Sequence, residues 1–229
     1  MKAIVLNAVR YSDNSFMVAM FTEQDGLVTA NVHTGGKRSK FRRSYLSPLT
    51  ILDVRLTGKS SSDVKYISDC SPAYFFRSLD TNPVKMFEAQ FIAEMLQKAL
   101  RYQQQDSGLF GFILDSVMTM DESSEGVCDC HVIFLVRLMS YVGIMPDISG
   151  FDAYSVFDIE EGRMVSQCMG QCLPHELCSS LVSIVNDEPF RMTSSQRSEF
   201  IDFIVKYYQH HLSGFGNIKT LEVFREMSR

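Results

Sequence analysis

The chain of 229 residues lacks several features that would place it in a special class of protein. Its 13 glycines and 6 prolines are too few for a collagen-like or largely disordered chain. No window approaches the 18 or more apolar residues of a membrane-spanning helix. The first residues form a short apolar run without a cleavage site of small residues, which favours a strand over a signal peptide. These absences predict a globular protein without a membrane segment, located in the cytoplasm.

Signatures of catalysis and cofactor binding are also missing. The sequence contains no G-x-S-x-G nucleophile turn, no Walker A phosphate loop and no G-x-G-x-x-G dinucleotide motif. The carboxylates of "MDESSE" (120–125) and "DIEEG" (158–162) fall in turn-like segments, and no acidic cluster suited to a metal-dependent nuclease can be assembled from them. His210 and His211 end a long predicted helix, where a cation is favoured by the helix dipole. We predict that the chain is not an enzyme and needs no cofactor.

The cysteines do not follow the spacing of a metal site. A chain of this length without an export signal is expected to keep its thiols reduced. No C-x2-C pair occurs, although "CDCH" and "CMGQCLPHELC" do combine cysteine with histidine, the ligands that zinc prefers. Buried free cysteine more often acts as a small apolar residue, so we predict no bound metal. The six cysteines are Cys70, Cys128, Cys130, Cys168, Cys172 and Cys178.

Positive charge is concentrated in the first third of an acidic chain. Residues 1–79 contain 11 Lys+Arg and 6 Asp+Glu, whereas residues 80–229 contain 11 and 21. The densest segment is "GGKRSKFRR" (35–43), which we call the basic loop. Such asymmetry points to two surfaces with different partners, the basic one suited to a polyanion. The cations of the basic loop are Lys37, Arg38, Lys40, Arg42 and Arg43.

The basic loop predicts a site for nucleic acid. Each phosphate that a cation neutralises releases counterions and adds affinity regardless of sequence. Phe41, among the cations, and Tyr45 are expected to offer rings on which unpaired bases stack. The alternatives are a solvated loop that keeps the fold soluble, or a loop that docks an acidic protein tail.

Hydrophobic periodicity divides the chain into two parts. Five β-rich segments with one long loop predict a small closed barrel such as an OB-fold, with a split sandwich as the alternative. They are residues 2–11, 15–22, 26–34, 50–58 and 63–70. After Pro72 the apolar period becomes helical. We therefore expect an N-terminal barrel in residues 1–75 and a helical domain in residues 76–229.

The helical part contains several distinct predicted elements. A helix begins at Pro83 with Asn82 as its N-cap, and the segment 130–143 is apolar almost all round, as expected of a central helix. Further helices are predicted at 108–120, 175–186, 194–212 and 217–228. Residues 146–171 interrupt them with a hairpin that turns at Glu161-Gly162.

Three stretches resemble the RecO family of bacterial recombination mediators. The first is "AIVLNAVRYSDNSFMVAMFTEQDGLVTANVHTGGKRSKFRRSYLSPLTILDV", which is similar to the opening of that family up to and beyond its basic loop. The second is "FLVRLMSYVGIMPDIS", similar to its central helix, and the third is "YYQHHLSGFGNIKTLEVFREM", similar to its ending. Together they span nearly the whole chain.

The resemblance implies an N-terminal OB-fold, a C-terminal helical domain and a non-enzymatic role in recombination repair at the nucleoid. Proteins of this family bind single- and double-stranded DNA and anneal complementary strands. They act with RecR to load RecA onto DNA coated by single-strand-binding protein, whose acidic C-terminal tail they contact. The DNA role falls on the cations of the basic loop, with Arg10 as an extension, and Arg137 is the candidate for the acidic tail.

One segment departs from the family pattern. Many members carry a four-cysteine zinc module after the Pro-Asp dipeptide, but residues 150–154 stand here where the first cysteine pair would lie, and Cys168 and Cys172 have the wrong spacing for the second. We expect the hairpin to lack the zinc module. Its predicted support comes instead from Phe151, Tyr154, Val156 and Phe157.

Overall fold

The computed structural model describes residues 1–35, 41–58, 64–123 and 129–221. The chain divides into two compact units, residues 1–128 and 129–229, which we describe separately. This division falls later than the domain boundary predicted after residue 75. The helices that follow the barrel, up to residue 122, therefore belong to the same compact unit as the barrel.

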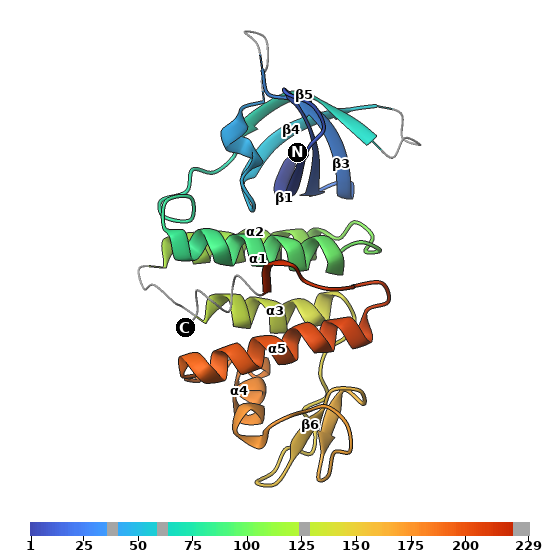
Figure 1. Cartoon of the computed structure of the whole chain (residues 1–229), viewed down its shortest axis with the longest axis vertical. Helices are drawn as coiled ribbons and strands as arrows, with labels where there is room; N and C mark the ends of the chain where they lie inside the picture. Colours follow the sequence, from blue (N-terminus) through green and yellow to red (C-terminus); the bar gives the residue numbers. More distant parts are fainter. Residues whose placement is uncertain (36–40, 59–63, 124–128, 222–229) are drawn as a thin grey trace. The chain divides into compact units, whose positions relative to one another are not determined.

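The first unit contains a closed barrel of five strands (Figure 1). Around the barrel the strands follow the order β1-β2-β3-β5-β4; β3 and β5 run parallel, and all other neighbours are antiparallel. The OB-like barrel is confirmed, and the split sandwich is not realised. The strands are β1 (Lys2–Arg10), β2 (Ser15–Thr22), β3 (Gly26–His33), β4 (Ile51–Thr57) and β5 (Val64–Pro72).

The barrel core follows from the alternation of side chains along each strand. One face of every strand contributes apolar side chains to the interior, most of which are alanine, valine and other aliphatic residues. Phe41, which follows the undescribed part of the basic loop, completes this core. The buried cluster comprises Ala3, Val5, Val18, Met20, Ala30, Val32, Phe41, Leu52 and Val54.

Two helices complete the first unit, α1 (Pro83–Ala99) and α2 (Ser107–Glu122). Figure 1 shows both on one side of the barrel, and the Phe21 and Phe110 rings, 5.9 Å apart, join β2 to α2. The Asn82 side chain accepts bonds from the backbone N–H groups of Val84 and Lys85, with proline at the first turn, as predicted. Asp106 caps α2 in the same way.

A buried polar network ties the connection before α1 to the end of α2. The Asp121 carboxylate accepts bonds from the backbone N–H groups of Arg77, Ser78 and Leu79 at 2.8–3.0 Å. The Lys85 ammonium donates to the Ser78 hydroxyl at 2.6 Å and to carbonyl oxygens at the end of α2, including that of Met120 at 2.8 Å. Asp121 and Lys85 are both buried. Each charge is therefore surrounded by groups of complementary polarity.

The described residues of the second unit form the helices α3, α4 and α5 and a small sheet. Most residues of α3 are buried, as predicted for a central helix, and the Tyr208 hydroxyl donates to the Leu135 carbonyl at 2.8 Å. The sheet has the order β7-β6-β8. The helices are α3 (Cys130–Tyr141), α4 (His175–Val185) and α5 (Ser194–His211), and the strands are β6 (Val156–Asp158), β7 (Arg163–Val165) and β8 (Cys172–Leu173).

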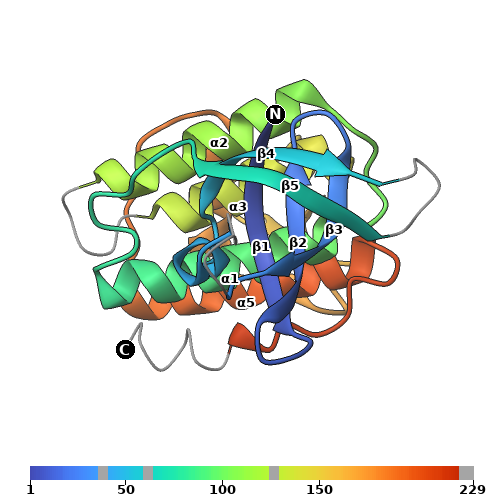
Figure 2. The same cartoon turned by 90° about the horizontal axis from the view of Figure 1, so that it is seen from above.

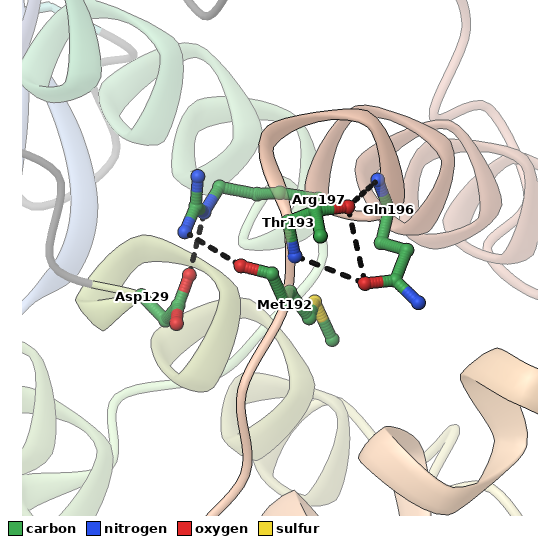
Figure 3. A network of polar contacts seen from close by, with 5 residues as sticks. All are labelled: Asp129, Met192, Thr193, Gln196 and Arg197. Carbon is green, nitrogen blue, oxygen red and sulfur yellow. Dashed lines mark hydrogen bonds and ion pairs between the residues drawn. The ribbon is translucent and has the colours of Figure 1, made fainter.

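The first turns of α3 and α5 meet at a largely buried ion pair (Figure 3). Arg197 donates from Nε to Asp129 Oδ1 at 2.5 Å and from its guanidinium to the Met192 carbonyl at 3.5 Å. Beside it, Thr193 and Gln196 form a reciprocal capping box at the start of α5. The pair and the capping box together fix where α5 begins against α3.

The predicted hairpin between residues 146 and 171 is present, with Gly162 at φ +69° in its turn. Phe157 is fully buried against Phe203 of α5, and Phe151 stacks on His175, as support for the hairpin requires. The prediction that Tyr154 helps to hold the hairpin is wrong, because its side chain is 84% exposed. The short strand β8, which pairs with β6, was not predicted.

The expectation that all thiols are reduced is also corrected. Cys168 and Cys172 form a disulfide, because the tight turn between them brings their Cα atoms to 6.4 Å, within the range that a disulfide bridges. Among the described cysteines, Cys70, Cys130 and Cys178 are not part of a disulfide. The bond closes a short loop that ends at β8.

Two other expectations concern the end of the chain and the membrane. The helix predicted at 217–228 lies mostly outside the described residues, although Thr220 and Leu221 are helical. Within the described ranges, no helix has the length and apolar character needed to cross a bilayer.

We expect Asp121→Asn to lower the free energy of unfolding by about 2–4 kcal/mol, because backbone N–H donors lose a charged acceptor. Urea unfolding at pH 7 measures this loss, and Asp115→Asn, at an exposed position on the same helix, is the matched control. An equal effect of the two substitutions would contradict the role given to Asp121.

The same pair of proteins should show a defined pH dependence. Burial raises the pKa of Asp121, but the N–H donors of Arg77, Ser78 and Leu79 outweigh burial and leave the pKa below its ordinary value. The stabilising charge is thus fully present above the unfolded pKa of about 3.9 and is lost as pH falls through the lower folded pKa. The difference between wild type and Asp121→Asn should therefore shrink below about pH 3.9.

Candidate nucleic-acid interface

The predicted site residues fall into two groups. Lys37, Arg38 and Lys40 lie outside the described residues. Arg10, at the end of β1, and Arg42 and Arg43, the N-cap and first residue of the short 3-10 helix η1 (Arg43–Leu46), are described and exposed. We call these three arginines the basic corner.

The basic corner is organised around the turn between β1 and β2. Arg10 forms an ion pair with the Asp13 carboxylate at 2.8 Å, and its Nε donates to the Ser12 carbonyl at 3.2 Å. Arg43 donates to the Asp13 carbonyl at 3.3 Å from thirty residues further along the chain. The turn therefore brings the predicted extension, Arg10, next to the end of the basic loop.

The beginning of the basic loop is attached to the same turn. The Thr34 N–H donates to the Asn14 carbonyl at 2.9 Å. At Gly35 a Cβ atom would lie only 2.6 Å from the Asn14 side chain, so any larger residue here would have to displace that side chain. The described parts of the basic loop thus start and end at one turn of the barrel.

Phe41 does not have the position expected of a stacking ring. Its side chain is 4% exposed and lies in the barrel core, with its ring 5.6 Å from that of Tyr45 in an edge-to-face contact. An apolar ring next to an open barrel end gains more from burial than from contact with water. We therefore reassign Phe41 from base stacking to anchoring the loop.

Exposed apolar side chains of the barrel were missed in the sequence. Val9, Tyr11 and Tyr66 are all more than half exposed. The period of two was no usable signal along β1, because the bulge between Val5 and Asn7 reverses the alternation and Val9 points outward although Ala3 and Val5 point inward. Which of them lie side by side depends on strand register, which local periodicity does not specify.

Arg137, the candidate for an acidic partner, has an exposed ion pair. Its guanidinium contacts the Asp187 carboxylate just after α4, and 48% of the Arg137 side chain is exposed. Tyr141, one turn further along α3, is also exposed. An exposed pair of this kind contributes about 0–1 kcal/mol to stability, so a carboxylate from a partner can replace Asp187.

The cysteine and histidine clusters do not assemble into a ligand set in the described part of the chain. No group of three or more His, Cys, Asp or Glu side chains there could hold a metal ion. Burial raises the pKa of Cys178 to about 11, so its thiol stays protonated at neutral pH. Cys128, part of the "CDCH" cluster, lies outside the described residues.

His211 has a structural rather than a simple capping role. Its Nε2 lies 2.7 Å from the Ile159 carbonyl, and its ring lies 4.2 Å from that of Tyr207. The side chain therefore links the end of α5 to the hairpin of the small sheet.

A cavity of about 440 Å³ lies in the first unit between the segment after η1 and the start of α1. Its lining is mostly apolar, and Asp80 is the one charged residue in it. A pocket of this kind accommodates an apolar group but disfavours an anion. The lining residues include Pro48, Phe76, Leu79, Met86 and Phe87.

Comparison with known proteins gives a consistent result over the whole chain. A family model described as Recombination protein O N terminal matches residues 1–76, and one described as Recombination protein O C terminal matches residues 81–151. The interval between the two matches lies next to the predicted domain boundary. The two models thus cover the barrel and the helices up to the start of the small sheet.

Full-length relatives carry the same description. The chain is 28% identical to the DNA repair protein RecO of Azobacteroides pseudotrichonymphae genomovar. CFP2, over 99% of this chain and 97% of the relative. It is 26% identical to that of Christiangramia forsetii, with the same coverage, and 27% identical to that of Porphyromonas gingivalis, over 97% and 96%.

An OB-like barrel followed by helices, together with these relatives, defines a protein of DNA repair and recombination. The chain belongs to the RecO family.

The position of Phe41 generates a test of stability. We expect Phe41→Ala to destabilise the protein by about 3–5 kcal/mol, because it removes a ring from the barrel core. Tyr11→Ala, which removes an exposed ring near the same corner, should change stability by less than about 0.5 kcal/mol. Thermal unfolding of both variants measures these differences. If Phe41→Ala were as stable as wild type, the anchoring role would be contradicted and Phe41 would again be a candidate for contact with DNA.

Proposed function

We propose that the protein is a recombination mediator that binds DNA, anneals complementary strands and, together with RecR, helps to load RecA onto DNA coated by single-strand-binding protein. The observation that carries this proposal is the basic corner, at the end of a barrel in a chain of the RecO family. Such a protein acts at the nucleoid in the cytoplasm.

The mechanism at the corner is electrostatic capture of the DNA backbone. Guanidinium groups bind phosphate with planar, charge-assisted hydrogen bonds. The Arg10–Asp13 pair is exposed and therefore weak, so Arg10 can exchange the carboxylate for a phosphate at little cost. Lys37, Arg38 and Lys40 would add further cations from the basic loop. Annealing follows because the cations reduce the repulsion between two strands held close together.

We assign no catalytic step to this function. The sequence lacks the signatures of nucleophilic and phosphate-binding sites. The buried carboxylate of Asp121 is committed to three backbone N–H groups and the Tyr74 hydroxyl, which leaves it without the freedom of a general base.

A second candidate function is that of an adaptor whose basic corner docks an acidic protein tail instead of DNA. The Arg10–Asp13 pair favours the adaptor, because Arg10 in the basic corner already binds a carboxylate. The two functions differ in ligand, since an adaptor would bind an acidic peptide and show no affinity for DNA.

For the acidic tail of single-strand-binding protein, we propose a site at Arg137. The arginine replaces Asp187 with a carboxylate of the tail, and Tyr141 offers an exposed ring for an apolar side chain. The cavity lined by Asp80 suits this partner less well, because the Asp80 carboxylate would repel an acidic tail.

DNA binding is tested by fluorescence anisotropy of a labelled single-stranded oligonucleotide at several salt concentrations. If three to five phosphates are neutralised, the log–log salt slope of wild type should be roughly −2 to −3.5. A variant with Lys37, Arg38, Lys40, Arg42 and Arg43 changed to Ala should bind more weakly and with a flatter slope. The control changes five other cations to Ala: Arg101, Arg163, Arg191, Lys206 and Lys219.

The outcomes separate the candidate functions. Equal loss in both variants would show that net charge matters and the corner does not. If wild type binds no DNA but binds an acidic peptide through the same five residues, the adaptor replaces the mediator.

The Arg137 site is tested with a fluorescent peptide that carries the C-terminal residues of the single-strand-binding protein. We expect Arg137→Ala to weaken peptide binding about five- to tenfold, as the loss of one charged contact predicts. Arg163→Ala, which removes another exposed arginine of the second unit that is also in an ion pair, is the control. Unchanged binding by Arg137→Ala would exclude this site.

A further inference from the structure

A row of four residues crosses the barrel beside the basic corner. In the strand register Val9 of β1 pairs with Met17 of β2, Met17 pairs with Asn31 of β3, and Asn31 pairs with Tyr66 of β5. We call these four residues the outer row. It spans three strand spacings, about 14 Å. Figure 2 shows β1, β2 and β3 side by side, so the row runs across one continuous sheet surface.

The outer row points away from the barrel core. On every strand its member is next to a residue that packs inside the barrel: Ala8, Val18, Ala30 and Ile67. Because successive side chains of a strand point to opposite faces, the row members face outward. Exposure agrees, since Val9 is 57% and Tyr66 56% exposed.

The chemistry of the row is aromatic, apolar and hydrogen-bonding. Tyr66 provides a ring at one end, and Met17 and Val9 provide apolar contacts at the other. The buried Ser15 hydroxyl donates to the Asn31 side-chain oxygen at 2.9 Å. This bond fixes the orientation of the Asn31 amide and leaves its NH2 group available to donate to a ligand. The row itself contains no charged side chain.

Charge lies at the end of the row instead. Arg10 follows Val9 at the end of β1 and starts from the opposite face of the strand, but its guanidinium reaches Asp13 in the β1–β2 turn, which Arg43 also contacts. A ligand that suits both features must therefore carry anions beside flat apolar groups. A nucleic-acid strand with unpaired bases has this composition, whereas a duplex hides its base faces between the strands.

We propose that the outer row binds unpaired bases, with Tyr66 as the stacking platform, and that this gives the protein a preference for single-stranded over double-stranded DNA. This inference rests on the proposed DNA-binding function. The basic corner holds the backbone of either kind of DNA, and the outer row adds contacts that only a single strand can make. Stacking on a ring tolerates any base, so no sequence preference follows.

The first experiment compares Tyr66→Ala and Tyr66→Phe with wild type on an oligonucleotide and on its duplex. Tyr66→Ala should weaken single-strand binding roughly five- to hundredfold, as expected for loss of one stacked base. Duplex affinity should change less than about twofold, and the salt slope should stay constant because no cation is lost. Tyr66→Phe should keep single-strand affinity. Tyr102→Ala, which removes a 74% exposed tyrosine after α1, is the matched control.

The second experiment uses the absence of tryptophan from the chain. Tyr66→Trp creates a sole indole in the outer row, and its emission should be quenched when an unlabelled single strand binds. The duplex should quench it little, and the indole of Tyr102→Trp should respond to neither. This direct readout does not depend on the stability of Tyr66→Ala.

The results distinguish the base-binding proposal for the outer row from the DNA-binding function on which it rests. If wild type binds DNA but Tyr66→Ala binds as tightly as wild type, or loses single-strand and duplex affinity equally, the outer row is not a base site and the DNA-binding function stands. If wild type binds neither form of DNA, both proposals fail. Quenching of Tyr66→Trp by an acidic peptide but not by a single strand would assign the row to a protein partner.

Discussion

The arrangement of the first unit depends on the pair of buried charges at the end of α2. The Asp121 carboxylate gathers three backbone N–H groups from the segment that leaves the barrel, and the Lys85 ammonium gathers carbonyl oxygens at the end of α2. A buried charge is tolerated only where complementary groups surround it, so neither the connection nor the helix can shift alone. This constraint explains why α1 and α2 form one compact unit with the barrel rather than with the later helices.

A fixed barrel in turn makes the basic corner a defined surface. Arg43, at one end of the basic loop, and Thr34, just before its other end, both donate hydrogen bonds to the turn between β1 and β2. Phe41 anchors the end of the loop in the barrel core. Cations on an unanchored loop would interact with any anion in reach. Under the proposed function, cations held at one end of a barrel, next to an outward row of uncharged side chains, would select for the shape and composition of the ligand.

Local sequence was enough for those parts of the fold that depend on local forces. The strand alternation, the Asn82 cap before Pro83 and the turn at Gly162 were all predicted, because periodicity, capping and positive φ each leave a mark within a few residues. Phe41 was misplaced because its burial is decided by a core built from distant strands. The disulfide was missed because a general argument about reducing conditions ignored the geometry of one tight turn, and β8 is too short to show any period.

The parallel pairing of β3 with β5 also determines at which stage of folding the outer row forms. β1, β2 and β3 follow one another as hairpins, whereas Asn31 and Tyr66 are brought together across the whole intervening chain, and non-local pairing of this kind is slow. The cations Arg10 and Arg43 meet through contacts to one turn, and the outer row is completed only when the barrel closes. Under the proposed function, a nascent or partly unfolded chain would therefore attract DNA before it could distinguish one strand from two.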